Sequence, residues 1–302
     1  MDNPLQVGIV GLDTSHCPAF TRILNDAAYE YHLPGARVIG AYPGGSELFS
    51  KSRERVQGFT GQLAGEFGVA IYDSIPALAQ DVDALFLESV DGRQHLDQFR
   101  QMAVGKPVYI DKPLTTTTGE ARALIALAQA THTPIMSCSS LRYAAGIADL
   151  LEGSEQVLSC EAFGPAPLLD DYPDLFWYGI HSAEILFALM GKGCRQVRCV
   201  HTPAIDLVVG EWADGRTGVL RGTRLGKDVF GCVVHTGHSA TPALASSTPP
   251  YYYLMLQQVL PFFRTGQSPI DIEETFEIIA FLEAAAQSKA RAGNAVRLAA
   301  GG

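Results

Sequence analysis

Residues 5–16 read Leu-Gln-Val-Gly-Ile-Val-Gly-Leu-Asp-Thr-Ser-His, and this stretch decides how the rest of the chain is interpreted. An apolar strand signal at 7–10 runs into Gly11 and a polar turn, and an apolar-periodic segment follows. This is the place and shape of a dinucleotide-binding G-x-G-x-x-G turn. Asp13 and His16 stand where its second and third glycines belong. Nucleotide binding by the turn therefore depends on where these two side chains point.

The first half of the chain alternates strand and helix signals. Strands are predicted at 7–10, 37–42, 69–72, 84–87, 108–110 and 135–138, and helices at 19–28, 56–67, 75–80, 95–104 and 119–131. Several of the strands are short continuous apolar runs, as is typical of strands that are buried on both faces. The alternation predicts an α/β fold with a Rossmann-type, doubly wound parallel sheet that binds ligands at the carboxyl ends of its strands.

The pattern changes near residue 141, which predicts a Rossmann-type domain at 1–141 and an α+β substrate and oligomerisation domain at 142–302. Helices are expected at 144–151, 175–190, 251–264 and 273–290, and strands at 157–163, 196–202, 206–212, 217–223 and 229–236. Strands in succession indicate an open, largely antiparallel sheet. The polar stretch 237–250 is expected to be a loop and is a candidate for a mobile lid.

Composition excludes several classes of function. The formal net charge is −10 and the sequence pI is about 5.2, which argues against nucleic acid and anionic membranes as partners. No apolar run reaches the roughly 20 residues of a membrane helix, and the chain starts without a leader signal. Six cysteines without a C-x-x-C pair predict reduced core thiols in a cytoplasmic protein, with a zinc site as the weaker alternative. We predict no metal site.

Three segments carry a resemblance to a known family. Gly105-Lys106-Pro107-Val108-Tyr109-Ile110-Asp111-Lys112-Pro113-Leu114 resembles the Lys-Pro strand and loop of the Gfo/Idh/MocA family (glucose–fructose oxidoreductase, inositol dehydrogenase, rhizopine catabolism). Residues 177–184 are similar to its D-x-x-x-H helix, and 273–289 to its C-terminal helix. The resemblance implies an NAD(P)-dependent oxidoreductase of a sugar, polyol or related alcohol or ketone. It also implies a homodimer or homotetramer.

The resemblance places the chemistry on two residues. Lys112 would orient or protonate the reacting oxygen, and a cis Pro113 would aim it. His181 would be the general base, since an imidazole accepts a proton near neutral pH, although a histidine in an apolar helix is often only a core residue. Tyr178 and Glu184 lie three positions either side of His181 on a helix and are candidates to orient it, with Tyr178 counted as catalytic. Trp177 replaces the family's aspartate.

The candidate cofactor-binding residues follow the predicted strands: Gly11, Asp13, Thr14, Ser15, His16, Tyr42, Gly44, Gly45, Ser89, Asp91, Asp111 and Lys112. An inward Asp13 would repel each phosphate charge by about 4 kcal/mol at roughly 4 Å, whereas an Asp13 that caps the first helix would not. Tyr42 replaces an acidic residue, and the glycines, serine and arginines after it favour NADP over NAD if either binds. His16 alternatively packs beneath the loop, and Asp91 alternatively forms a turn.

Two other functions remain open from the sequence. The fold could serve without redox chemistry of a free cofactor, as a carbohydrate lyase, epimerase or hydrolase in which Lys112 and His181 only transfer protons. A non-enzymatic sensor or assembly subunit is the third reading. The altered glycines of the phosphate turn motivate the first of these two alternatives.

Overall fold

The computed structural model describes residues 3–151 and 155–299 and divides into two compact units. The first unit comprises 1–115, 119–138 and 252–272, and the second comprises 116–118, 139–251 and 273–302. This differs from the predicted division at 141/142, because the segment 252–272 belongs to the first unit.

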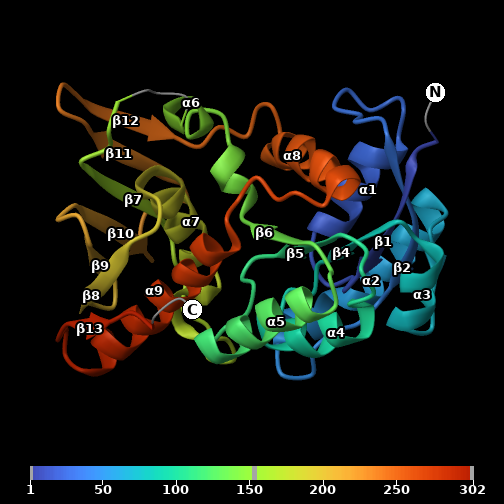
Figure 1. Cartoon of the computed structure of the whole chain (residues 1–302), viewed down its shortest axis with the longest axis horizontal. Helices are drawn as coiled ribbons and strands as arrows, with labels where there is room; N and C mark the ends of the chain where they lie inside the picture. The colour runs from blue at the N-terminus through green and yellow to red at the C-terminus, as the bar shows by residue number, and fades with distance from the viewer. Residues whose placement is uncertain (1–2, 152–154, 300–302) are drawn as a thin grey trace. The chain divides into compact units, whose positions relative to one another are not determined.

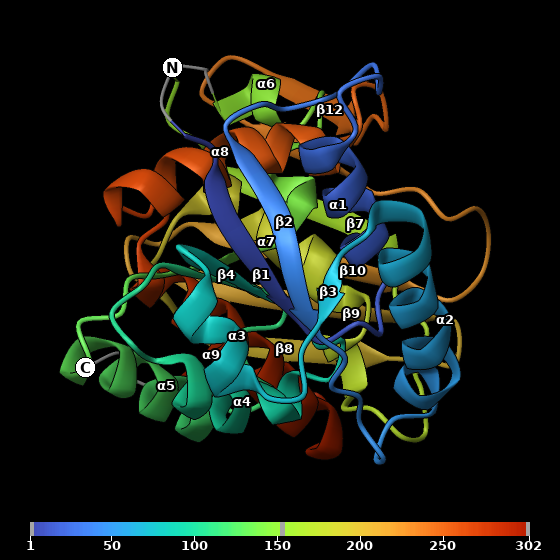
Figure 2. The same ribbon diagram turned by 90° about the vertical axis from the view of Figure 1, so that its right-hand side faces the viewer.

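The first unit is built on a six-stranded parallel sheet with the order β3-β2-β1-β4-β5-β6. Strands β3, β2, β1 and β4 are labelled in Figure 2, and β5 and β6 in Figure 1. Its strands are β1 (Leu5–Val10), β2 (Ala36–Tyr42), β3 (Ala70–Ile71), β4 (Ala84–Leu87), β5 (Val108–Asp111) and β6 (Ile135–Cys138). Every residue of β4 and β5 is buried, as their continuous apolar runs indicate. The order confirms the predicted doubly wound sheet.

The helices of this unit are α1 (His16–Asn25), α2 (Ser50–Phe67), α3 (Ile75–Asp81), α4 (His95–Met102), α5 (Thr118–Ala130) and α8 (Tyr251–Thr265), with the 3-10 turn η1 (Gly92–Gln94). α8 lies beside α1 (Figure 1) and packs its aromatic rings on the unit. The ring centroids of Phe263 and Phe86 are 5.0 Å apart, and those of Tyr252 and Phe20 are 5.5 Å apart. These contacts explain why α8 belongs with the first sheet.

The second unit has a seven-stranded sheet with the order β12-β11-β7-β10-β9-β8-β13. Its strands are β7 (Ser159–Pro165), β8 (Cys194–His201), β9 (Ile205–Trp212), β10 (Thr217–Thr223), β11 (Gly231–His235), β12 (Ala240–Leu244) and β13 (Val296–Arg297). All pairings are antiparallel except that of β7 with β10. The prediction of a loop over 237–250 is wrong at 240–244, which form the edge strand β12. This strand is largely exposed and contains polar residues and a proline, so it lacks the apolar pattern of a strand.

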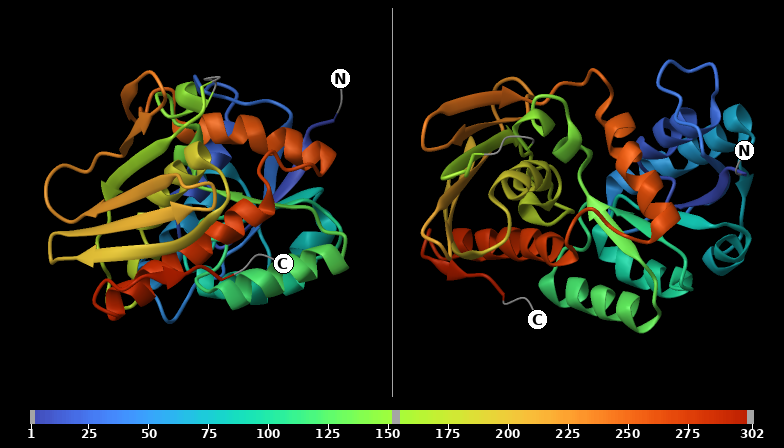
Figure 3. Two further views of the ribbon diagram at one scale, coloured as in Figure 1. Left: turned by 60° about the vertical axis from the view of Figure 1, so that its left-hand side comes forward. Right: turned by 45° about the horizontal axis from the view of Figure 1, so that its top comes forward.

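The helices α6 (Ala148–Leu151), α7 (Gly179–Met190) and α9 (Ile272–Ala290) accompany this sheet, with the 3-10 turns η2 (Ser140–Tyr143) and η3 (Asp174–Phe176). α7 is almost entirely buried and packs on β7, β10 and β11, and α9 runs along the same sheet (Figure 3). The predicted helix 175–190 is interrupted, so that Trp177 and Tyr178 precede α7 instead of lying within it.

None of the described helices combines the length and apolar character needed to span a bilayer.

Candidate functional site

The turn after β1 retains the first glycine for a steric reason. Gly11 has φ +90°, and a Cβ there would collide with the backbone nitrogen and Oγ of Ser89. Gly11 N–H donates to the Tyr42 carbonyl at 3.0 Å, and Leu12 N–H donates to the Pro43 carbonyl at 2.7 Å. The turn is therefore held between the loops that follow β2 and β4.

Asp13 adopts neither of the two predicted orientations. Its carboxylate is fully buried and accepts hydrogen bonds from Ser52 Oγ at 2.5 Å and from Val90 N–H at 2.9 Å. Burial raises the pKa of Asp13, while these two hydrogen bonds oppose that rise. Asp13 thus ties the turn to α2 and to the loop after β4, and it neither caps α1 nor faces an anion at the helix terminus.

The amino end of α1 keeps a main-chain donor for an anion. The amides of Thr14 and Ser15 precede the helix; the Thr14 amide is directed at the Cys17 thiol, and the Ser15 amide has no acceptor within the described part of the chain. Ser15 is exposed, whereas the side chain of Thr14 is turned inward. Amides at a helix start bind phosphate well, so the turn remains suited to a pyrophosphate although two glycines are replaced.

The loop after β2 approaches the turn closely. Gly44 and Gly45 both have positive φ, and a Cβ on Gly44 would lie 3.3 Å from the Gly11 Cα. Tyr42 is half-buried at the end of β2. The glycines therefore serve the close packing of two loops.

Ser46, in the loop after β2, and Asp91, in the loop after β4, are hydrogen-bonded to each other. Ser46 Oγ donates to Asp91 Oδ2 at 2.6 Å, and Arg93 Nε donates to Asp91 Oδ1 at 2.8 Å. Burial opposes ionisation of Asp91, but the bonds from Arg93 and Ser46 hold its pKa below the usual value. Asp91 also accepts from Arg93 N–H at the start of η1, so it forms the turn that was the alternative reading. Because Ser46 Oγ is hydrogen-bonded to Asp91, the argument that this serine binds the 2′-phosphate of NADP is removed.

A buried cluster of charged groups lies where β4 and β5 end. His16 Nδ1 is 3.3 Å from Glu88 Oε2 and 3.2 Å from Asp111 Oδ2. Lys112 Nζ is 3.5 Å from the same oxygen of Asp111. All four side chains are buried. His16 therefore packs beneath the turn, as its alternative reading had it.

The groups of this cluster change one another's ionisation. Burial alone would lower the pKa of His16, but the Asp111 and Glu88 carboxylates outweigh it and raise the pKa to about 9. Burial and the neighbouring charge of Asp111 raise the pKa of Glu88 to about 8. Asp111 is also desolvated, yet His16 and Lys112 hold its pKa well below the usual value. The sequence did not lead us to assign a role to Glu88. Its position directly after a buried strand could have marked it as a site residue.

Lys112 is a buried group instead of a surface lysine. Its side chain is 9% exposed, and the Lys112–Pro113 peptide bond is cis, as predicted. A Cβ on Gly92 would come within 2.9 Å of the Pro113 ring, so the two loops are in contact. The end of β5 thus holds the lysine ammonium against the Asp111 carboxylate.

In the second unit, His181 is anchored through one ring nitrogen. Its Nδ1 lies 2.6 Å from Ser139 Oγ, which also accepts a hydrogen bond from Leu141 N–H at 3.1 Å. The rings of Tyr178 and Phe230 pack edge-on against the imidazole, with centroids 5.6 and 5.4 Å away. Ser139 was missed by the sequence analysis, since it lies 42 positions from His181.

The two residues predicted to orient His181 behave differently. Tyr178 lies before α7, is 37% exposed and contacts the His181 ring. Glu184 is instead buried and accepts from Arg142 Nε at 2.6 Å, so its predicted role is wrong. Burial raises the pKa of Glu184 although Arg142 opposes the rise. Arg142 also bonds to Glu274, which joins η2, α7 and α9.

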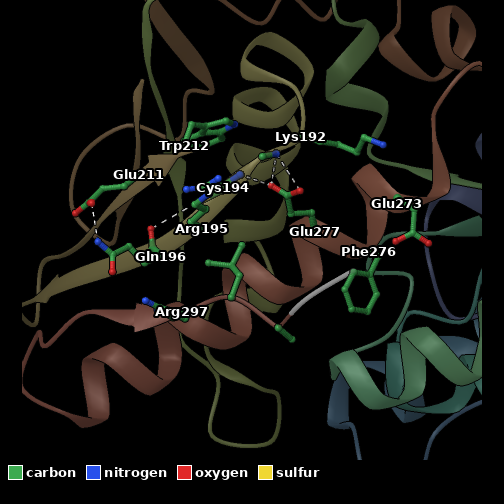
Figure 4. Close-up of a pocket in the computed structure, with 13 residues that line it drawn as sticks. Lys192, Cys194, Arg195, Gln196, Glu211, Trp212, Glu273, Phe276, Glu277 and Arg297 are labelled. Atoms are coloured by element: carbon green, nitrogen blue, oxygen red, sulfur yellow. Dashed lines mark hydrogen bonds between the residues drawn. The ribbon is translucent and has the colours of Figure 1, made fainter. Parts of the chain in front are cut away.

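A cavity of about 940 Å³ lies in the second unit beside β8 and β13 (Figure 4). Glu277 points to its wall and accepts from Gly193 N–H at 2.8 Å and Cys194 N–H at 2.6 Å. No predicted site residue lines this cavity. The cysteines are all free and buried, as expected for core thiols.

The parallel sheet, its phosphate turn and the following antiparallel-sheet unit define a two-domain protein of the Rossmann type. Residues 5–138 match the family model described as "Oxidoreductase family, NAD-binding Rossmann fold". This part of the chain, which includes the Lys-Pro segment 105–114, is thus similar to the Gfo/Idh/MocA oxidoreductases, in agreement with the resemblance seen there in the sequence.

Solved structures with the same fold cover nearly the whole chain. Myo-inositol 2-dehydrogenase from Lactobacillus plantarum is 14% identical with TM-score 0.78, covering 98% of this chain and 100% of that one. Myo-inositol dehydrogenase from Lactobacillus casei, solved with NAD(H) and myo-inositol, is 15% identical with TM-score 0.76, covering 99% and 98%. UDP-N-acetylglucosamine 3-dehydrogenase GnnA from Acidithiobacillus ferrooxidans is 17% identical with TM-score 0.73, covering 95% and 98%. No curated protein sequence matches the chain.

Proposed function

We propose that the chain is an NAD(P)-dependent oxidoreductase that interconverts an alcohol and a ketone on a sugar, polyol or related compound. The buried Asp111–Lys112 pair at the carboxyl end of β5, in a sheet of the nucleotide-binding type, carries this proposal. The similarity to dehydrogenases of myo-inositol and of a nucleotide sugar supports the substrate class.

The residues of the phosphate turn fit a dinucleotide. The Ser15 amide at the start of α1 would hold the pyrophosphate. The predicted repulsion falls away because the Asp13 carboxylate is bound to Ser52 and Val90. The nicotinamide, when bound, supplies the hydride acceptor.

Lys112 and His181 divide the acid–base work in this proposal. The Lys112 ammonium, held by Asp111, donates a hydrogen bond to the reacting oxygen and stabilises its negative charge. Because Ser139 Oγ has two acceptor sites, it accepts from both Leu141 N–H and His181 Nδ1–H, and His181 Nε2 then carries the lone pair that takes the hydroxyl proton. That both groups serve one substrate molecule is part of the proposal.

Titration calorimetry with NAD+ and with NADP+, followed by a turnover assay on sugars and polyols, tests this function. We expect micromolar binding of one cofactor and formation of its reduced form with at least one substrate. Binding of neither cofactor would overturn the proposal, as would solvent-proton exchange into a sugar without any cofactor.

The proposal includes a homodimer or homotetramer, because the second unit presents an open sheet. It also includes a cytoplasmic location, since the cysteines are free thiols. Light scattering after size exclusion measures the assembly. A monomer at micromolar concentration would contradict this part of the proposal alone.

A further inference from the structure

Three side chains from separate elements of the first unit bring their donor atoms together. Single donor atoms of His16, Glu88 and Asp111 all lie within 4.8 Å of one another, and the three residues are buried. The two contacts of His16 Nδ1 are 3.3 Å and 3.2 Å long. A tetrahedral zinc ion with ligand distances near 2.0–2.1 Å spaces its donors about 3.3–3.4 Å apart. The two distances from His16 Nδ1 already match that spacing, and the two carboxylate oxygens lie within 4.8 Å of each other.

Protons alone leave this cluster incompletely satisfied. One Nδ1–H serves one acceptor well, yet two carboxylates face the same nitrogen. Within the described residues, Glu88 Oε1 has no hydrogen-bond partner, whereas Asp111 Oδ2 lies 3.2 Å from His16 Nδ1 and 3.5 Å from Lys112 Nζ. The side chains of Glu88 and Asp111 are 0% and 3% exposed. Buried polar atoms normally have partners, so the unpartnered Glu88 Oε1 points to a missing ligand.

We propose that His16 Nδ1 and the carboxylates of Glu88 and Asp111 bind one divalent transition-metal ion, with Zn²⁺ as the best fit. One imidazole and two carboxylates are a donor set for zinc with a fourth position left open. Calcium and magnesium prefer six or more oxygen ligands, which this site does not offer. The rings of Phe20 and Tyr252 pack on the His16 imidazole, with centroids 5.6 and 4.9 Å away, and keep it in place.

Lys112 opposes this ion and thereby provides a sharp test. Its ammonium lies 3.5 Å from the Asp111 oxygen that would bind the metal. Two cations that share one oxygen repel each other strongly in a buried site. Replacement of Lys112 by methionine should therefore tighten metal binding at least tenfold, whereas a site unrelated to this cluster would not respond.

The experiment measures the whole chain after treatment with EDTA and dialysis. Calorimetry and metal analysis with Zn²⁺ should give one ion per chain, with a rise in melting temperature. Glu88→Gln and Asp111→Asn should lose the ion. Glu277→Gln is the matched control, because Glu277 is a partly buried carboxylate bonded to Gly193 and Cys194 in the second unit and should leave binding unchanged.

Cobalt provides a second measurement. We expect Co²⁺ to give the visible spectrum of a four-coordinate ion in the native chain and in Glu277→Gln, and to lose it in Glu88→Gln, with circular dichroism confirming that each variant is folded. Failure of the native chain to bind Zn²⁺ would overturn the site, as would unchanged binding by Glu88→Gln or preference for Mg²⁺. None of these readouts needs nucleotide or turnover, so failure of the site and failure of the proposed function are distinguishable.

Discussion

The two histidines to which the sequence drew attention lie in opposite surroundings. His16 is buried in the first unit between Glu88 and Asp111, with Lys112 beside the latter. His181, in the second unit, is partly exposed, and its Nδ1 is hydrogen-bonded to the neutral hydroxyl of Ser139.

This difference separates a charge-holding role from a proton-transfer role. Two carboxylates stabilise a cation at His16, which suits a fixed proton or a metal ion but not rapid exchange. The Ser139 hydroxyl carries no charge, so it can orient the ring of His181 through a hydrogen bond, as a general base needs. The same residue type therefore serves different chemistry because its neighbours differ in charge.

The largest effect that sharpens this comparison is on turnover. We expect His181→Gln and Lys112→Met each to lower kcat by about 10²–10⁴-fold, because each removes a group that moves or stabilises a proton in the transition state. The double variant should lose less than the product of the two losses if both act in one step. His235→Gln, at an exposed histidine, is the control and should stay within about twofold. If the double variant lost the full product of the two single losses, Lys112 and His181 would act in separate steps.

A stability test follows from the buried ion pairs of the second unit. Arg142→Met should lower the free energy of unfolding by about 3–5 kcal/mol, because Glu184 is left buried without its cation. Burial already raises the pKa of Glu184, so the folded chain binds its proton more tightly than the unfolded chain. The loss should thus be small below pH 4, where Glu184 is protonated, and should grow as the pH rises through the folded-state pKa of Glu184, which lies above its usual value of 4.5.

Denaturant unfolding at several pH values measures this dependence. Arg198→Met is the matched control, since the Arg198–Glu211 pair is exposed, and its effect should stay within about 0.5 kcal/mol. A pH-independent loss would assign the effect of Arg142 to packing instead of charge.

Replacing Asp13 by the glycine that the motif has at this position should lower the free energy of unfolding. Asp13→Gly should cost about 1–3 kcal/mol of unfolding free energy, because the buried Val90 N–H loses its acceptor. Asp13→Asn is the control, since its amide keeps an acceptor for Val90 and a group for Ser52. Thermal melts compare the two variants, and a stabilised Asp13→Gly would refute the structural role of Asp13.

The smallest expected effect concerns the positioning of His181. Ser139→Ala should lower kcat about tenfold, equal to about 1.4 kcal/mol, with little change in KM, because the imidazole loses the hydrogen bond that sets its tautomer. Ser139→Thr retains a hydroxyl and should recover most of the rate. A change in KM alone, or no rescue by threonine, would place Ser139 outside the proton-transfer step.

Local sequence signals predicted the first sheet well and the second less well. Strands β4, β5 and β6 are short apolar runs buried on both faces, and such runs are visible without knowledge of their neighbours. The edge strand β12 is exposed and carries no such run. The break at Trp177 and Tyr178 was hidden because both residues suit a helix that packs on a sheet.

The sequence by itself indicated a doubly wound parallel sheet, the lysine that follows β5 and the histidine of α7, because these depend on periodicity and on motifs of neighbouring residues. Only the tertiary structure decided that Asp13 binds Ser52 and Val90, that Glu88 joins His16 and Asp111, and that Ser139 holds His181. Those partners are separated by 39 to 77 positions where a hydrogen bond joins them, and no local pattern specifies which distant side chains will share a desolvated space.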